Sequence, residues 1–273
     1  MMKVSSYHLP TDRLDFETHL KYVSLLAKLS KGVSVTCTLK PKLNKSKLNA
    51  LKNKLQLIEL TKKSIQDEYK IVQIDKEYST ASVLWLPIKT YYLAYHLLCI
   101  TDYLISDDIR SLSEKHSKCI DTFTKMLSSG AIQFSEPLLN GVYDKSILNF
   151  KTVSGELLRA GVKDEILYKS LMKKIAKEKI ENFKISNGIV EVRTKKNKDK
   201  VEKFKNSLTV SIFDFFYSMR LRMNYRNFNF IDDIPSVNTK TYFEEYYKTA
   251  GCFYVAFSNL KNKLISDISV GTV

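Results

Sequence analysis

Residues 80–106 read TASVLWLPIKTYYLAYHLLCITDYLIS, and their apolar side chains surround a helical projection almost completely. Leu93 and Leu97 fall on one side of that helix, whereas Tyr91 falls on another. A helix that is apolar on all sides is buried against several neighbours. We therefore expect a central helix over 80–106, with Pro87 close to its true start, where the missing N–H group costs least.

The same helical spacing of apolar residues recurs on both sides of the central helix. It predicts an all-α helical bundle of about seven helices, with at most two short strands. The further helices are expected over residues 12–29, 45–69, 111–127, 163–183, 206–226 and 239–265. The segments that alternate like a strand are 33–39 and 189–193.

The composition agrees with a helical, folded chain. Hydrophobic residues make up 44% of the 273 residues, which is enough apolar surface to offset the entropy of ordering most of the chain. The chain holds only 8 Gly and 5 Pro, too few for the many tight turns of a sandwich or barrel. Because no internal repeat and no linker divides it, we expect a single domain in which residues 130–205 form an inserted elaboration.

The charge balance indicates a polyanionic partner. There are 44 Lys and Arg against 29 Asp and Glu, a formal net charge of +15. Such a charge is typical of proteins that bind RNA or another polyanion, but it supplies only the non-specific part of binding. The alternative is that many of the lysines only keep the protein soluble.

The cysteines, histidines and apolar segments exclude several other classes of protein. The four cysteines form no CxxC element and no ligand pair with the four histidines, so we expect no metal site. The glycine-rich motifs that bind the phosphates of nucleotide cofactors are also absent. The apolar stretch 81–105 is interrupted by Lys89 and Asp102, and the amino terminus lacks an apolar signal core. We therefore expect a cytoplasmic protein with no cofactor, no disulfide framework and no membrane contact.

Three segments carry a resemblance to a known family. They read IKTYYLAYHLL at 88–98, SEKHSKCIDTF at 113–123 and RLRMNYRNFNFID at 220–232. Over residues 85–125 and 207–265 the chain resembles the HEPN family, helical-bundle domains associated with RNA cleavage, toxin–antitoxin pairs and antiviral defence. It is most similar to the branch found beside small nucleotidyltransferases. The resemblance implies a partner protein, either an antitoxin or a nucleotidyltransferase-like protein, and a homodimer is a further hypothesis.

Arg110 and His116 are the first candidate catalytic residues. Catalytic members of the HEPN family carry an Arg followed a few residues later by a His, and this pair has that spacing. The resemblance implies metal-independent RNA cleavage, in which the His activates the 2′-OH or the leaving group and the Arg steadies the phosphate. A capping box of Ser111 and Glu114 predicts a helix start at about Ser111, which leaves Arg110 outside the helix. The alternative is that His116 is a packing residue and Arg110 a surface cation.

Residues 220–226, RLRMNYR, are the second candidate. They lie where the resemblance places the catalytic helix, but no His follows at the required spacing, which favours phosphate binding over cleavage. Arg222 and Arg226 project from one side of a helix and suit bidentate contact with a phosphate. The alternative is an ion pair with Asp214 or Asp232. The candidate nucleic-acid-binding residues are Arg222, Asn224, Tyr225 and Arg226.

Three classes of function therefore stay open. The first is an RNA-binding HEPN-like protein that acts as a metal-independent endoribonuclease in a defence or toxin–antitoxin system. The second is a non-catalytic helical module that binds RNA or a protein, and the third is a structural subunit of an oligomeric complex. The most specific form of the first class is a composite site in which His116 meets Arg222 or Arg226 across the bundle. Tyr92, Tyr95 or Tyr225 is expected nearby.

Overall fold

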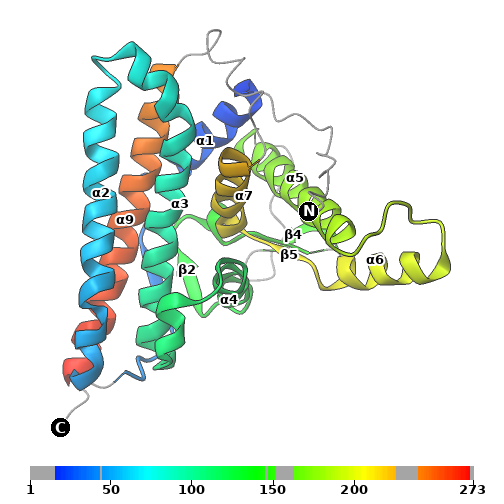
Figure 1. Cartoon of the computed structure of the whole chain (residues 1–273). Helices are drawn as coiled ribbons and strands as arrows, with labels where there is room; N and C mark the ends of the chain where they lie inside the picture. Colours follow the sequence, from blue (N-terminus) through cyan, green and yellow to red (C-terminus); the bar gives the residue numbers. More distant parts are fainter. Residues whose placement is uncertain (1–15, 44, 145–146, 152–162, 226–238, 271–273) are drawn as a thin grey trace, which may run out of the picture.

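Helices dominate the part of the chain that the computed structural model describes, residues 16–43, 45–144, 147–151, 163–225 and 239–270. The predicted all-α helical bundle is confirmed (Figure 1). The α-helices are α1 (Phe16–Ser30), α2 (Lys52–Ile71), α3 (Lys76–Ser106), α4 (His116–Ser128), α5 (Lys163–Ser186), α6 (Lys195–Ser207), α7 (Ile212–Tyr225) and α9 (Thr239–Val270). The 3₁₀ helices are η1 (Lys45–Leu51), η2 (Ile109–Ser113) and η3 (Pro137–Asn140).

The central helix of the prediction is α3, which packs against α2, α7 and α9. It begins at Lys76, earlier than predicted, because the Asp75 carboxylate accepts a hydrogen bond from the Tyr78 backbone N–H at 2.9 Å and caps the helix. Pro87 is buried inside α3, so the expectation that the helix begins near this proline is wrong. Packing on all sides of α3 stabilises the helix despite the hydrogen bond that the proline removes.

Among the described helices, α3 alone has the length and apolar composition of a membrane span. However, 78% of its apolar window is buried inside the bundle. Such burial is typical of the core helix of a soluble protein.

The described chain also contains five short strands, so the prediction of at most two is wrong. They are β1 (Val35–Cys37), β2 (Ile132–Phe134), β3 (Val142–Asp144), β4 (Ile147–Lys151) and β5 (Thr209–Val210). β1 pairs antiparallel with β2, and β3 pairs antiparallel with both β4 and β5. β1 lies in the predicted segment 33–39, whereas 189–193 forms no strand. Most of these strands are too short to carry enough alternating positions to be recognised.

Residues 130–205 are tied to the rest of the bundle by these strands. β2 pairs with β1, and β3 pairs with β5, so both sheets join this region to segments outside it. α5 packs against α1 and α7, whereas α6 packs mainly on α5 and lies at the edge of the molecule (Figure 1). The sequence prediction had no helix over α6, because its single buried apolar residue, Val201, gives no helical stripe. The predicted start of the first helix at residue 12 lies outside the described residues.

Candidate functional site

His116 is the first residue of α4, so the predicted helix start at Ser111 is wrong. Ser111 instead lies in η2, which is capped by Asp108. The capping box does not form because the Glu114 carboxylate turns forward and accepts a hydrogen bond from the backbone N–H of Lys115 at 3.0 Å. Because η2 ends before α4 begins, His116 lies at the amino-terminal end of α4, where its imidazole is partly exposed.

Four tyrosine rings surround the His116 imidazole, and we call this group with His116 the tyrosine–histidine cluster. Tyr91 is buried, and its hydroxyl is hydrogen-bonded to His116 Nδ1. The ring centroid of Tyr95, one helical turn later on α3, lies 4.3 Å from that of the imidazole. Tyr92 meets the imidazole edge-on at 5.8 Å, and Tyr217 of α7 stacks on it at 6.4 Å. The cluster therefore joins α3, α4 and α7.

Arg220 of α7 adds a positive charge to the tyrosine–histidine cluster. Its Cζ lies 5.9 Å from the ring centroid of Tyr91 and 5.7 Å from that of Tyr92, both within cation–π range. Its Nη2 donates a hydrogen bond to the Tyr92 hydroxyl at 3.4 Å. Arg220 belongs to the RLRMNYR segment but was not among the predicted site residues. The signal that identifies it is its position three residues after Tyr217, on the same face of α7.

The surroundings of His116 favour a neutral imidazole. Burial lowers the pKa of His116, and the positive charges of Arg220 and Lys54 lower it further. Burial also lowers the pKa of the neighbouring His96 to about 4, again with help from Lys54. Burial raises the pKa of Tyr91 far above its ordinary value, so its hydroxyl stays protonated. A neutral imidazole beside two cations is suited to accept a proton next to a bound anion.

Arg110 does not join this cluster through any contact among the described residues. Its guanidinium binds the carboxylate of Asp108, with Nε–Oδ1 at 2.9 Å and Nη2–Oδ2 at 2.7 Å. The Arg110 side chain is 84% exposed. The structure thus places Arg110 as a surface cation, as the alternative interpretation had it, while His116 lies among the tyrosines.

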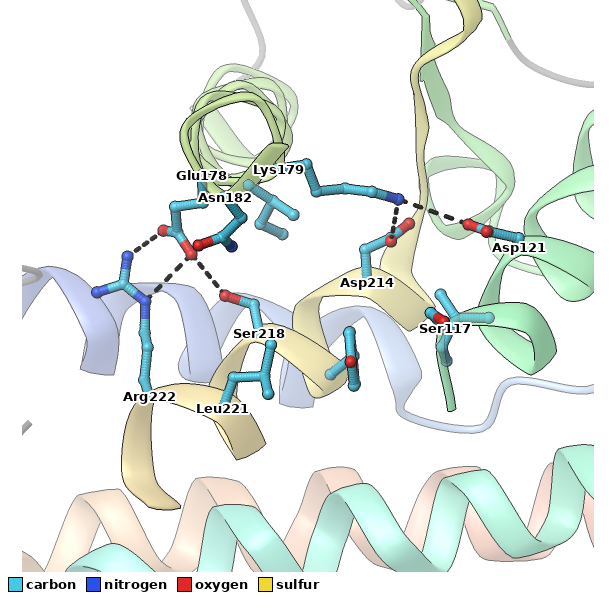
Figure 2. Close-up of a pocket in the computed structure, with 12 residues that line it drawn as sticks. Ser117, Asp121, Glu178, Lys179, Asn182, Asp214, Ser218, Leu221 and Arg222 are labelled. Carbon is cyan, nitrogen blue, oxygen red and sulfur yellow. Dashed lines mark hydrogen bonds and ion pairs between the residues drawn. The ribbon is translucent and has the colours of Figure 1, made fainter. Parts of the chain in front are cut away.

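Arg222 faces α5 rather than His116. Its guanidinium binds Glu178, with Nε–Oε2 at 3.2 Å and a second bond from Nη2 to Oε1, and Ser218 Oγ donates to the same carboxylate at 2.7 Å (Figure 2). The partner of Arg222 is therefore Glu178 and not Asp214. Asn224 and Tyr225 are the last two residues of α7, whereas Arg226 and Asp232 lie outside the described residues.

A pocket of about 120 Å³, with a largely apolar lining and charged side chains from α4, α5 and α7, lies between these helices (Figure 2). Lys179 crosses it from α5, with Nζ 2.7 Å from Asp214 and 3.7 Å from Asp121. Burial raises the pKa of Asp214, and the Lys179 charge opposes that shift. Tyr217 lines this pocket and also stacks on His116, and Ser117 lines it directly after His116. The pocket and the tyrosine–histidine cluster are therefore neighbours.

The described residues hold no group of three or more His, Cys, Asp or Glu side chains that is placed to bind a metal ion. Cys99 of α3 and Cys119 of α4 are both buried and carry free thiols.

Comparison of the chain with protein-family models, curated proteins and solved structures gives no match. The resemblance to the HEPN family therefore rests on the three quoted segments alone, and the function follows from the geometry of the site as a proposal.

Proposed function

We propose that the protein is a HEPN-like, RNA-binding endoribonuclease that cleaves single-stranded RNA without a metal ion. The observation that carries this proposal is the partly exposed imidazole of His116, hydrogen-bonded to the Tyr91 hydroxyl in the cluster that also holds the guanidinium of Arg220. A base for proton abstraction and a fixed cation for a phosphate are the two groups that this chemistry needs.

The reaction that suits these groups is an internal transfer on the RNA backbone. His116 Nε2 takes the proton of a 2′-OH, and the 2′ oxygen attacks the adjacent phosphorus. The bond between phosphorus and the 5′ oxygen breaks, and that oxygen takes a proton from solvent. The products are a 2′,3′-cyclic phosphate and a 5′-OH end. Arg220 stabilises the negative charge that develops on the phosphate oxygens.

Tyr91 acts as a positioning residue in this proposal. Its hydroxyl oxygen must accept a hydrogen bond from Nδ1–H, because only that tautomer leaves a lone pair on Nε2 for the 2′-OH. Arg220 replaces the predicted Arg222 as the phosphate-binding cation, since Arg222 already neutralises Glu178. Arg110 has no role in this mechanism.

The test is cleavage of an end-labelled single-stranded RNA in the presence of EDTA, with detection of the cyclic phosphate. His116→Ala is expected to slow cleavage by about 10²–10⁴-fold, the range of a lost general base. Arg220→Gln is expected to slow it by about 10²–10³-fold, as when one donor to a developing oxyanion is removed.

Arg110→Gln is the matched control, because it removes the same charge from the residue that the sequence paired with His116. Cleavage by Arg110→Gln is expected to equal that of the unmodified protein. Full activity of His116→Ala, or loss of activity in Arg110→Gln alone, contradicts the assigned site.

A non-catalytic RNA-binding module is the second candidate function. The separation of Arg110 from His116 favours it, because the Arg–His spacing typical of catalytic HEPN members is not used as a pair here. Binding of RNA without any cleavage, unchanged in His116→Ala, is the outcome that selects this candidate.

A further inference from the structure

α6 is a basic helix that adds almost nothing to the main core. Its thirteen residues, KKNKDKVEKFKNS, contain six lysines and two acidic residues. Figure 1 shows it at the edge of the molecule, away from α2, α3 and α9. Only Val201 of α6 is buried, and it lies outside the main cluster of buried residues. We call this helix the basic arm.

The basic arm is nevertheless held firmly on α5. The rings of Phe204 and Phe183 stack face to face, with centroids 4.1 Å apart and planes within 6°. Thr194 caps the helix by accepting a hydrogen bond from the backbone N–H of Asn197 at 3.3 Å. The arm therefore presents its lysines in a fixed arrangement.

Most lysines of the basic arm are uncompensated. Lys205 pairs with Glu202, but five others are exposed and pair with no acidic side chain among the described residues. These five are Lys195, Lys196, Lys198, Lys200 and Lys203. Lys196, Lys200 and Lys203 follow helical spacing along one face, opposite Val201. One positive charge per helical turn on an exposed face suits a chain of phosphates better than a single anion.

The position of the arm links it to the pocket beside His116. Asn182 lines that pocket, and the next residue, Phe183, holds the arm through its stack with Phe204. From Glu178 in the pocket to Ser186 at the end of α5 the helix rises by only about 12 Å. A nucleic-acid strand that crosses the pocket therefore continues onto the arm after a few nucleotides.

A membrane surface fits the arm less well. Helices that lie in a membrane interface need a broad exposed apolar face. Of the two large apolar residues of α6, Val201 is buried and Phe204 stacks on Phe183 of α5. The exposed apolar side chains nearby, such as Val190, lie in the turn before the helix.

We propose that the basic arm is the docking surface for the phosphate backbone of the single-stranded RNA substrate. This inference rests on the proposed function, since it names the surface that holds the strand cleaved at His116. It assigns a specific place to part of the net charge of +15, most of which is spread over other helices.

The test compares two variants that remove equal charge from different places. The arm variant carries Lys195→Gln, Lys196→Gln, Lys198→Gln, Lys200→Gln and Lys203→Gln. The control variant carries Lys31→Gln, Lys40→Gln, Lys52→Gln, Lys63→Gln and Lys76→Gln, all exposed lysines outside α6. The probe is a labelled single-stranded RNA with 2′-O-methyl groups, which cannot be cleaved, and circular dichroism checks that both variants fold.

The readout is the slope of log affinity against log salt, measured by fluorescence anisotropy. For single-stranded nucleic acid each phosphate contact contributes about 0.7 to that slope, so loss of all five lysines removes up to about 3.5. A slope of that size makes a difference of about 100-fold between roughly 50 and 200 mM salt. The slope is expected to fall by at least half of this amount in the arm variant. In the control variant it is expected to fall by less than the contribution of one phosphate contact.

Three results overturn the inference: equal loss in both variants, no RNA binding by the unmodified protein, or an arm that binds anionic phosphatidylserine vesicles but no RNA. Failure of the proposed cleavage is separate, because the probe does not depend on it. If His116→Ala cleaves RNA normally while the arm variant loses affinity, the catalytic assignment fails and the arm stands. If the two lysine variants bind alike while His116→Ala is inactive, only the arm fails.

Discussion

Replacing Tyr91 with Phe tests the geometry of the tyrosine–histidine cluster directly. The change deletes one buried hydroxyl and keeps the ring, so the packing of α3 against α4 and α7 is retained. The hydroxyl makes one described hydrogen bond, to His116 Nδ1. Such a bond is worth about 0.5–1.5 kcal/mol net, so the free energy of unfolding is expected to fall by about that amount.

The same energy sets the expected loss of activity. If the bond holds the imidazole in its working orientation and tautomer, losing it reduces the productive fraction by about 2–13-fold at 1.36 kcal/mol per factor of ten. That loss is expected in kcat, with KM nearly unchanged, because Tyr91 does not reach the substrate. It is much smaller than the loss expected for His116→Ala.

The direction of the pKa change distinguishes the two tautomers. If the Tyr91 oxygen accepts a hydrogen bond from Nδ1–H, it stabilises the imidazolium form, and Tyr91→Phe lowers the pKa of His116 further. If Tyr91 instead donates to Nδ1, it stabilises the neutral form, and the substitution raises that pKa. Nitrogen-detected NMR of the imidazole across a pH titration measures both the tautomer and the pKa.

Tyr95→Phe is the matched control for this experiment. Its ring lies even closer to the imidazole, but its hydroxyl donates to the backbone carbonyl of Glu114 at 2.5 Å and not to His116. This variant is expected to leave the tautomer of His116 unchanged. A raised His116 pKa in Tyr91→Phe, or equal effects of both substitutions on kcat, refutes the proposed role of Tyr91.

Three further predictions concern the surroundings of the site. Arg222→Gln leaves Glu178, which is only 19% exposed, without its cation. The free energy of unfolding, measured in urea, is expected to fall by about 1–3 kcal/mol. RNA cleavage is expected to fall less than in Arg220→Gln. The buried His19 has its pKa lowered to about 3, chiefly by burial, so the unfolded chain binds more protons between that value and about 6.5. Stability is therefore expected to fall as the pH drops through this window, by up to about 1.4 kcal/mol per pH unit, and thermal unfolding of His19→Gln is expected to show a shallower dependence. Phe204→Ala removes the stack that holds the basic arm. Amide hydrogen exchange is therefore expected to become faster over Lys195–Ser207, while α3 keeps its protection. A uniform rise in exchange over the whole chain contradicts a separately held arm.

The sequence alone was sufficient for the features that depend on local periodicity. The apolar residues around the central helix predict its burial, and the structure places α3 in contact with α2, α7 and α9. His116 was singled out as a candidate from its spacing and resemblance, and the structure puts it in a partly exposed cluster. The helix boundaries near Ser111 and Pro87 were predicted wrongly, because competing caps at Asp108 and Asp75 decide them.

The tertiary structure decided which charged groups meet. Arg220 and Arg222 are two residues apart in one short segment, and the sequence could not show which distant side chains each of them meets. On a helix such residues point to nearly opposite sides, so Arg220 lies over Tyr91 and Tyr92 while Arg222 binds Glu178. The basic arm is a second example. Its lysines can be read from the sequence, but only the stack of Phe204 on Phe183 determines where in the molecule they lie. Periodicity within one helix is a local property, whereas the partner of each side chain depends on how distant helices pack.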